Sequence, residues 1–132
     1  MTFSHFLVTR FNVRLPFGGR VNLDPRWLDH RHALFERFCL PAVTGQSTKA
    51  FRWLLLCDAR TPEPHRSRLE GYERVSNAEI IWVDDEVQAG LRAAVAARLG
   101  HGTHVITSRL DNDDAICRDF VERVQEAARP AA

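Results

Sequence analysis

The chain has 132 residues, of which 45% are hydrophobic and 27% charged, as expected for one soluble domain with its own core. Its 18 basic and 17 acidic residues leave a formal net charge of +1, which argues against a nucleic-acid-binding domain driven by a general basic field. No apolar run approaches the roughly 18 to 20 residues of a membrane span. The first residues also lack the pattern of a signal peptide, so we expect a cytoplasmic protein.

Short apolar runs alternate with longer stretches of helical periodicity along the chain. The first run, residues 6–11, predicts a buried strand. Pro25, with an aspartate before it, indicates the start of a helix, which we expect Pro41 to kink or restart and which should end near Gly45. The run 51–57 is the most apolar stretch and predicts the second strand.

The second half of the chain continues this alternation. The polar stretch after Pro64 predicts a short surface helix, and 79–83 predicts the third strand. Helical spacing of apolar residues over 87–99 and 116–124 predicts two further helices, with the fourth strand, 104–110, between them. Strands separated by helices favour parallel pairing through crossovers. We therefore expect an α/β fold with a doubly wound, mostly parallel, Rossmann-like sheet of about four strands and helices on both faces.

Polar and acidic residues follow the predicted strands, at the edge where open parallel sheets bind ligands. Asn12 follows the first strand, Asp58 the second, and Asp84 and Asp85 the third. The fourth strand runs directly into the acidic segment 111–114. For Asp84 and Asp85 we expect a role as caps of the following helix.

The acidic segment brings three carboxylates, those of Asp111, Asp113 and Asp114, into four residues, so each raises the cost of ionising the next. A hard divalent cation such as Mg²⁺ or Mn²⁺ would offset this repulsion and leave coordination positions for phosphate oxygens. Helix capping by one aspartate accounts for one carboxylate and not for three. An EF-hand loop is excluded because Ala115 and Ile116 stand where its next ligand and its turn glycine belong.

The residues around this segment, 107–116, resemble the signature of the putative rhamnosyltransferase family of bacteria. That family is similar to the nucleotide-sugar glycosyltransferases of the GT-A fold, which carry a DxD motif. The resemblance covers nearly the whole chain, from about residue 5 to residue 125. Further blocks agree with it in order and spacing, and they are 5–14, 35–41, 51–58 and 61–62.

The resemblance implies roles for the acidic residues. In GT-A enzymes the aspartates of the DxD motif reach the ribose and the metal that bridges the diphosphate. Asp111 would therefore face the nucleotide, and Asp111 and Asp113 would hold a Mn²⁺ or Mg²⁺ ion. Asp114 would be an outer support or a helix cap. Asp58, at the end of the second strand, would contact the base or the ribose.

The resemblance also implies that Thr9, Arg10 and Asn12 line the base pocket. Arg109 would neutralise phosphate charge, with a structural pairing to a neighbouring aspartate as the alternative. The implied activity is that of a glycosyltransferase, which transfers a sugar from a nucleotide-diphosphate sugar, such as dTDP-rhamnose, to a hydroxyl of a saccharide or other acceptor.

The acceptor side of this reaction has no predicted residues. In GT-A enzymes the general base and the acceptor pocket lie in a C-terminal half beyond the DxD helix, whereas this chain ends about 18 residues after Asp114. We therefore expect residues 1–132 to be a single donor-binding domain without that half, able to associate with itself or with a missing partner. The alternative function is a non-catalytic remnant or regulatory domain that binds nucleotide and metal.

Two other protein classes are disfavoured. A phosphoacceptor receiver domain needs acidic residues after its first strand and a lysine late in the chain, whereas the only lysine here is Lys49. A haloacid-dehalogenase-like phosphatase places its DxD after the first strand, whereas here the motif follows the fourth.

Overall fold

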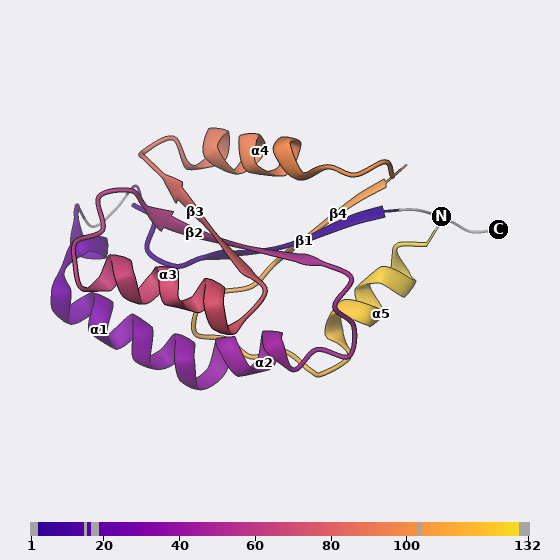
Figure 1. Cartoon of the computed structure of the whole chain (residues 1–132), viewed down its shortest axis with the longest axis horizontal. Helices are drawn as coiled ribbons and strands as arrows, with labels where there is room; N and C mark the ends of the chain where they lie inside the picture. Colours follow the sequence, from indigo (N-terminus) through magenta and orange to yellow (C-terminus); the bar gives the residue numbers. More distant parts are fainter. Residues whose placement is uncertain (1–2, 15, 17–18, 103, 130–132) are drawn as a thin grey trace.

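The computed structural model describes residues 3–14, 16, 19–102 and 104–129. Within these residues, a sheet of four parallel strands has the order β3-β2-β1-β4 (Figure 1). The strands are β1 (Phe3–Arg10), β2 (Arg52–Asp58), β3 (Ala78–Val83) and β4 (His104–Arg109). The chain thus adds strands on one side of β1 and then returns to place β4 on its other side. The predicted doubly wound α/β fold is confirmed.

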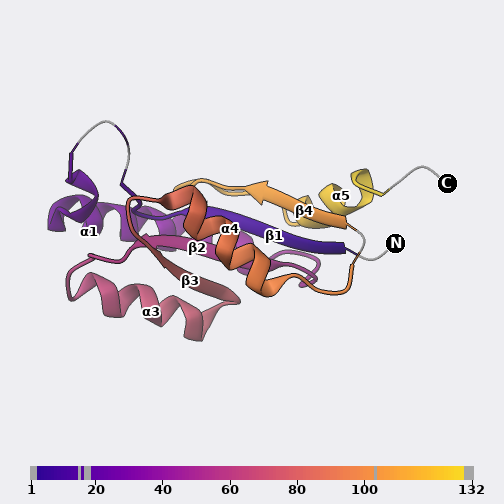
Figure 2. The same cartoon turned by 90° about the horizontal axis from the view of Figure 1, so that it is seen from above.

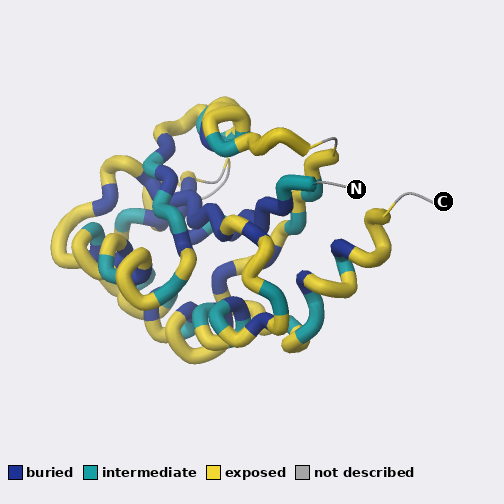
Figure 3. The backbone as a smooth tube through the Cα atoms, turned by 45° about the vertical axis from the view of Figure 1, so that its right-hand side comes forward, coloured by how far each residue is buried: buried dark blue, intermediate teal, exposed yellow. Residues whose placement is uncertain are grey.

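The two central strands form because both of their faces are buried. Every residue of β2 from Trp53 to Asp58 is buried, and so are residues 5–9 of β1. Figure 3 shows these buried segments running through the middle of the molecule. Such runs are continuous rather than alternating because helices cover both sides of a parallel sheet.

One long helical rod follows β1 and consists of three parts in direct succession. The first, α1 (Pro25–Leu34), begins where Asp24 accepts hydrogen bonds from the backbone N–H groups of Arg26 and Trp27. A π-helical turn (Phe35–Cys39) and α2 (Leu40–Thr44) complete the rod. Since proline has no N–H to continue the α-helical ladder, the restart expected at Pro41 is confirmed as this π turn and the new helical segment after it.

The helices are divided unequally between the two faces of the sheet. The rod, α3 (His65–Val75) and α5 (Phe120–Ala127) lie on one face, and α4 (Val87–Arg98) lies on the other (Figures 1 and 2). Leu7, Phe35 and Trp53 belong to the core of the first face, and Phe6 and Leu54 to that of the second. The expectation of helices on both faces is therefore confirmed. No helix of the described residues is long and apolar enough to cross a membrane.

The last helix begins later than its sequence pattern predicts. It starts at Phe120, and the segment from Asp111 to Asp119 forms an irregular loop with a turn in which the Asp114 N–H bonds the Asp111 carbonyl at 3.2 Å. Ile116 packs against the core from this loop. Its apolar character therefore reflects an anchor of the loop and not the first turn of a helix.

Candidate functional site

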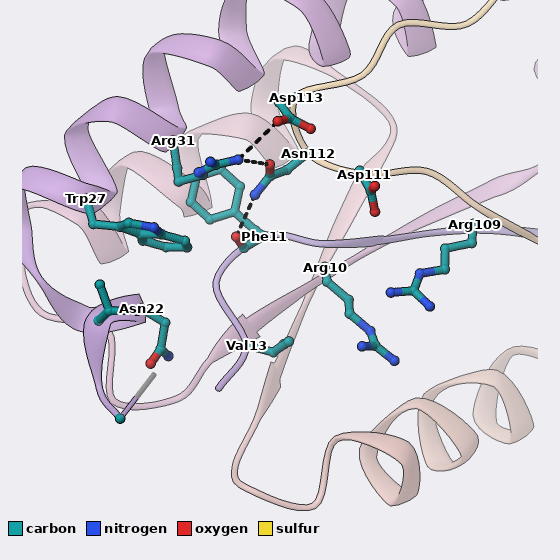
Figure 4. Close-up of a pocket in the computed structure, with 12 residues that line it drawn as sticks. Arg10, Phe11, Val13, Asn22, Trp27, Arg31, Arg109, Asp111, Asn112 and Asp113 are labelled. Carbon is teal, nitrogen blue, oxygen red and sulfur yellow. Dashed lines mark hydrogen bonds and ion pairs between the residues drawn. The ribbon is translucent and has the colours of Figure 1, made fainter. Parts of the chain in front are cut away.

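The strand order places a pocket at the carboxyl edge of the sheet, between β1 and β4. The chain places β2 and β3 on one side of β1 and then β4 on its other side, so the strand order reverses between β1 and β4. Doubly wound sheets bind ligands at the carboxyl edge of such a topological switch point. The pocket has a volume of about 440 Å³. Its described lining residues come from the ends of β1 and β4, from the short 3₁₀ turn Val21–Leu23 and from α1 (Figure 4), and they are Arg10, Phe11, Val13, Gly19, Val21, Asn22, Trp27, Arg31, Arg109, Asp111, Asn112 and Asp113.

Alternation along the chain after β4 delivers two carboxylates to this pocket. Leu110 is buried and its N–H donates to the carbonyl of Val8 at 3.0 Å, which extends the pairing of β4 with β1 by one residue. Asn112 is also buried, and its side-chain amide donates to the Phe11 carbonyl at 2.7 Å. Leu110 and Asn112 point inward. Asp111, which lies between them, and Asp113, which follows them, therefore remain exposed. The asparagine within the motif thus fixes the loop that carries both aspartates.

The two aspartates have different surroundings. Asp113 faces α1, where its Oδ2 accepts a hydrogen bond of 3.3 Å from Nη1 of Arg31. The same Nη1 donates to Oδ1 of Asn112 at 3.1 Å, and the guanidinium lies 5.4 Å from the ring centroid of Trp27. The side chain of Asp111 has no hydrogen bond or ion pair within the described part of the chain, and it lies on the Arg109 side of the loop (Figure 4).

Two arginines extend from the ends of the paired strands. Arg10 is the last residue of β1 and Arg109 the last of β4, and Figure 4 shows both side chains extending toward the lower part of the view, with their guanidinium groups turned toward one another. Neither side chain has an ion-pair or hydrogen-bond partner among the residues that the structure describes, so Arg109 is not paired with an adjacent aspartate there. With Arg31, three arginines and two aspartates line the described pocket, which leaves one excess positive charge. Such a pocket favours an anion.

A buried polar network lies beneath the pocket and joins the ends of β1 and β2. The amide of Asn12 donates to Thr61 Oγ1 at 2.8 Å, and its oxygen accepts the N–H of Asp58 at 3.1 Å. The amide of Asn22 donates to the Asn12 carbonyl at 2.8 Å and to Asp58 Oδ2 at 3.0 Å. The network fixes the 3₁₀ turn, and with it one wall of the pocket, to the sheet.

Asp58 is the only charged residue of this network, with 1% of its surface exposed. Burial alone would raise its pKa, but hydrogen bonds from the side chain and backbone of Arg60 and from Asn22 outweigh burial and lower the pKa below its ordinary value. Arg60 also donates to Asp85 Oδ1 at 2.7 Å. The expected capping role of Asp85 is therefore wrong, because its side chain makes an ion pair with Arg60 and no hydrogen bond to the start of α4 among the described residues. Asp84 does bond a backbone N–H, that of Glu86, at 2.8 Å just before α4.

The structure brings together four of the predicted site residues, since Arg10, Arg109, Asp111 and Asp113 all line the pocket. The other three lie deeper, outside its described lining. Thr9 is fully buried and accepts a hydrogen bond of 2.9 Å from Nε1 of Trp53. Asn12 and Asp58 belong to the buried network described above.

Other lining residues carry no sequence signal for the site. Trp27 and Arg31 stand one helical turn apart on α1, and the spacing of Trp27 with later apolar residues indicates only a face that packs on the core. Phe11 and Asn22 lie in segments whose sequence predicts a strand end and a loop. Only the approach of α1 to the carboxyl edge of the sheet assigns these side chains to the pocket.

The donor chemistry of the pocket is compatible with a hard divalent cation. Among the described residues, no group of three or more His, Cys, Asp or Glu side chains is placed to hold a metal ion. Asp111 and Asp113 offer carboxylate oxygens alone, which suits Mg²⁺ or Mn²⁺, because these ions take one or two carboxylates and complete their coordination with water and substrate phosphates. Zinc, which prefers nitrogen and sulfur ligands, does not fit this set.

Residues 19–131 match the model of a family described as putative rhamnosyl transferase. The matched segment contains Trp27, Arg31, Asp58 and the whole loop after β4, whereas Arg10 precedes it. A comparison with curated proteins finds no match.

Proposed function

Because the chain belongs to the putative rhamnosyl transferase family, we propose that it is a glycosyltransferase whose pocket binds a nucleotide-diphosphate sugar, with dTDP-rhamnose as the expected donor. The acceptor is a hydroxyl of a saccharide or another molecule. The observation that carries this proposal is the convergence of Arg10 and Arg109, which have no side-chain partner among the described residues, with Asp111 and Asp113 at the switch point between β1 and β4.

The two arginines are suited to the diphosphate of the donor. A guanidinium donates parallel hydrogen bonds to the oxygens of a phosphate and keeps its charge at any physiological pH. Arg10 and Arg109 extend from neighbouring strand ends, so one diphosphate can contact both without a movement of the sheet. As the bond between sugar and phosphate breaks, negative charge grows on the diphosphate, and these arginines stabilise it.

Asp111 and Asp113 are the residues that would hold a Mn²⁺ or Mg²⁺ ion. Such an ion, when bound, stabilises charge on the leaving diphosphate as a Lewis acid. Asp111 is the readier ligand because its carboxylate has no partner among the described residues. Asp113 must exchange its contact with Arg31 or use its second oxygen.

The apolar part of the pocket is suited to the nucleoside or the sugar. Phe11, Val13 and Trp27 form this wall, and aromatic side chains bind flat rings and the apolar faces of sugars. Thr9, Asn12 and Asp58 support the wall from below in this proposal. The acceptor hydroxyl must lose its proton as the new bond forms, and we propose that an acceptor-binding half supplies the base.

Calorimetric titration with dTDP and UDP, each with and without MnCl₂, tests the donor site directly. We expect one nucleotide to bind, and to bind more tightly with Mn²⁺. Arg109→Gln should weaken binding by roughly 10- to 100-fold, the usual effect of losing a charge-assisted hydrogen bond. Arg74→Gln removes the same charge from an exposed site on α3 and should leave binding unchanged. If neither nucleotide binds the wild-type chain, the proposal is wrong.

Release of dTDP from dTDP-rhamnose distinguishes a transferase from a non-catalytic binding domain. Water can take the place of the acceptor hydroxyl, so the assay is run first without an acceptor. Steady release that Asp111→Asn abolishes would support catalysis by this chain. Nucleotide binding without release, even with added saccharides, would favour the binding-domain alternative.

A further inference from the structure

The guanidinium of Arg31 lies against Asp113, one of the two carboxylates that we assign to the metal. Its Nη1 is 3.3 Å from Asp113 Oδ2 and 3.1 Å from Asn112 Oδ1. Asp111, only two residues earlier, has no such partner in the described part of the chain. The protein therefore supplies its own cation to one of two neighbouring carboxylates.

The bond between Arg31 and Asp113 has the features of an exchangeable contact. A quarter of the Arg31 side chain and 40% of the Asp113 side chain are exposed, and ion pairs so exposed to water are weak. Nε of Arg31 is buried and has no hydrogen-bond partner. This guanidinium thus has a donor that its present position does not satisfy, although it lines the pocket proposed for an anion.

The position of Arg31 on α1 allows its guanidinium to contact either Asp113 or an anion in the pocket. The side chain starts from a rigid helix beside Trp27, whose ring lies 5.4 Å from the guanidinium. Arg31 and Trp27 both line the pocket (Figure 4). A change of rotamer moves the charged end without a change in the fold.

From these contacts we infer that Arg31 is a positioning residue that holds Asp113 while no metal is bound and turns to the donor's diphosphate when a divalent cation takes that carboxylate. This inference rests on the proposed function. It has a thermodynamic consequence. Metal alone competes with Arg31 for the carboxylate of Asp113, whereas metal with a nucleoside diphosphate offers Arg31 another anion. The two ligands therefore bind with positive coupling, and each raises the affinity for the other by the same factor.

Direct Mn²⁺ binding tests the inference without any turnover. The electron paramagnetic resonance signal of free Mn²⁺ gives its affinity for the whole chain, with and without saturating dTDP. Arg31→Gln should bind Mn²⁺ alone on the order of three- to tenfold more tightly than wild type, since a nearby positive charge is lost. The same variant should lose most of the increase in Mn²⁺ affinity that dTDP causes. Arg31→Lys, which retains the charge, should remain close to wild type.

Arg26→Gln is the matched control, because it removes an arginine from the exposed first turn of the same helix, outside the pocket. It should change neither Mn²⁺ affinity nor coupling. A purely structural Arg31 would lower the melting temperature of Arg31→Gln and leave Mn²⁺ affinity unchanged or weaker, and this result would overturn the inference. If dTDP binds but wild type and Arg31→Gln have the same Mn²⁺ affinity, the inference fails and the proposed function stands. If dTDP and UDP do not bind wild type at all, both fail.

Discussion

Asn112 and Phe11 are 101 positions apart in the sequence, and the amide of Asn112 donates to the carbonyl of Phe11 at 2.7 Å. This hydrogen bond ties the loop after β4 to the loop after β1, and both loops line the pocket. It is buried, so neither group has water as an alternative partner.

Asn112→Ala should therefore destabilise the protein and loosen the site together. The Phe11 carbonyl would be left without a partner, which costs about 1–3 kcal/mol of the free energy of unfolding. Nucleotide binding should also weaken, because Asp111 and Asp113 depend on Asn112 for their position. Urea unfolding and calorimetric titration measure the two effects. Asn77→Ala, at an exposed asparagine before β3, should leave both unchanged.

Asp58→Asn tests the buried network below the pocket. The pKa of Asp58 is lower in the folded protein than its ordinary value of 3.8, with hydrogen bonds from Arg60 and Asn22 outweighing the effect of burial. The stability that this carboxylate contributes is therefore complete well above pH 3.8, and it is lost as the pH falls through 3.8 toward the folded pKa. We expect the variant to lose roughly 1.5–3 kcal/mol at pH 7, as for other hydrogen bonds to charged groups.

Urea unfolding at a series of pH values between 7 and 3 checks this prediction. The difference in stability between wild type and Asp58→Asn should narrow as the pH falls below about 4. Asp85→Asn removes an exposed partner of the same arginine and should have a smaller effect at every pH. An equal loss at all pH values would show that the charge of Asp58 is not what stabilises the network.

His32 should make the protein sensitive to mild acid. It is completely buried, shares a hydrogen bond of 2.7 Å with Tyr72 and stacks on His65. Burial, with smaller effects of Arg68 and His65, lowers the pKa of His32 from 6.5 to about 3. The unfolded chain takes up this proton below pH 6.5 while the folded chain does not. Stability is therefore complete above pH 6.5 and falls as the pH drops from 6.5 toward 3, by up to about 1.4 kcal/mol per pH unit.

His32→Phe keeps an aromatic ring at this position and removes the group that titrates. Its unfolding free energy should decline less steeply between pH 7 and pH 5 than that of wild type, although His5, whose pKa burial also lowers, leaves part of the slope. His30→Phe, at an exposed position on the same helix, should keep the full slope. Equal slopes in wild type and His32→Phe would contradict the prediction.

Gly90 on α4 should not tolerate a methyl group. A Cβ at this position would lie 2.7 Å from Cγ1 of Val83, a buried and β-branched residue of β3 with little freedom to move. Gly90→Ala should lower stability by about 1–3 kcal/mol through overpacking. Gly71→Ala is the matched comparison on α3, where a Cβ meets nothing within 4 Å. It should raise stability by roughly 0.5–1 kcal/mol, because alanine favours a helix more than glycine does. Thermal unfolding of both variants measures whether each substitution raises or lowers stability.

The sequence was sufficient to predict the sheet and one side of the pocket. Strands buried on both faces appear as continuous apolar runs, and the residues that follow them lie at one edge, so Asp111 and Asp113 could be placed at that edge. Only the resemblance to the rhamnosyltransferase family assigns Arg10 and Arg109 to the site. It could not assign Trp27 and Arg31, since the face of α1 that meets that edge depends on tertiary packing. Nor could it place Thr9 in the core rather than the pocket, because both faces of β1 are covered and alternation along the strand carries no information there.

The position of β4 has a consequence for how the site comes into being. β4 is the last strand of the described residues, yet it pairs with β1, the first of them. The pocket therefore requires contacts between residues about a hundred positions apart, and such long loops are slow to close. A chain emerging from the ribosome has its central strands long before it has a complete pocket. Binding of a nucleotide would then favour completely folded molecules. By mass action it would also stabilise the pairing of β1 with β4.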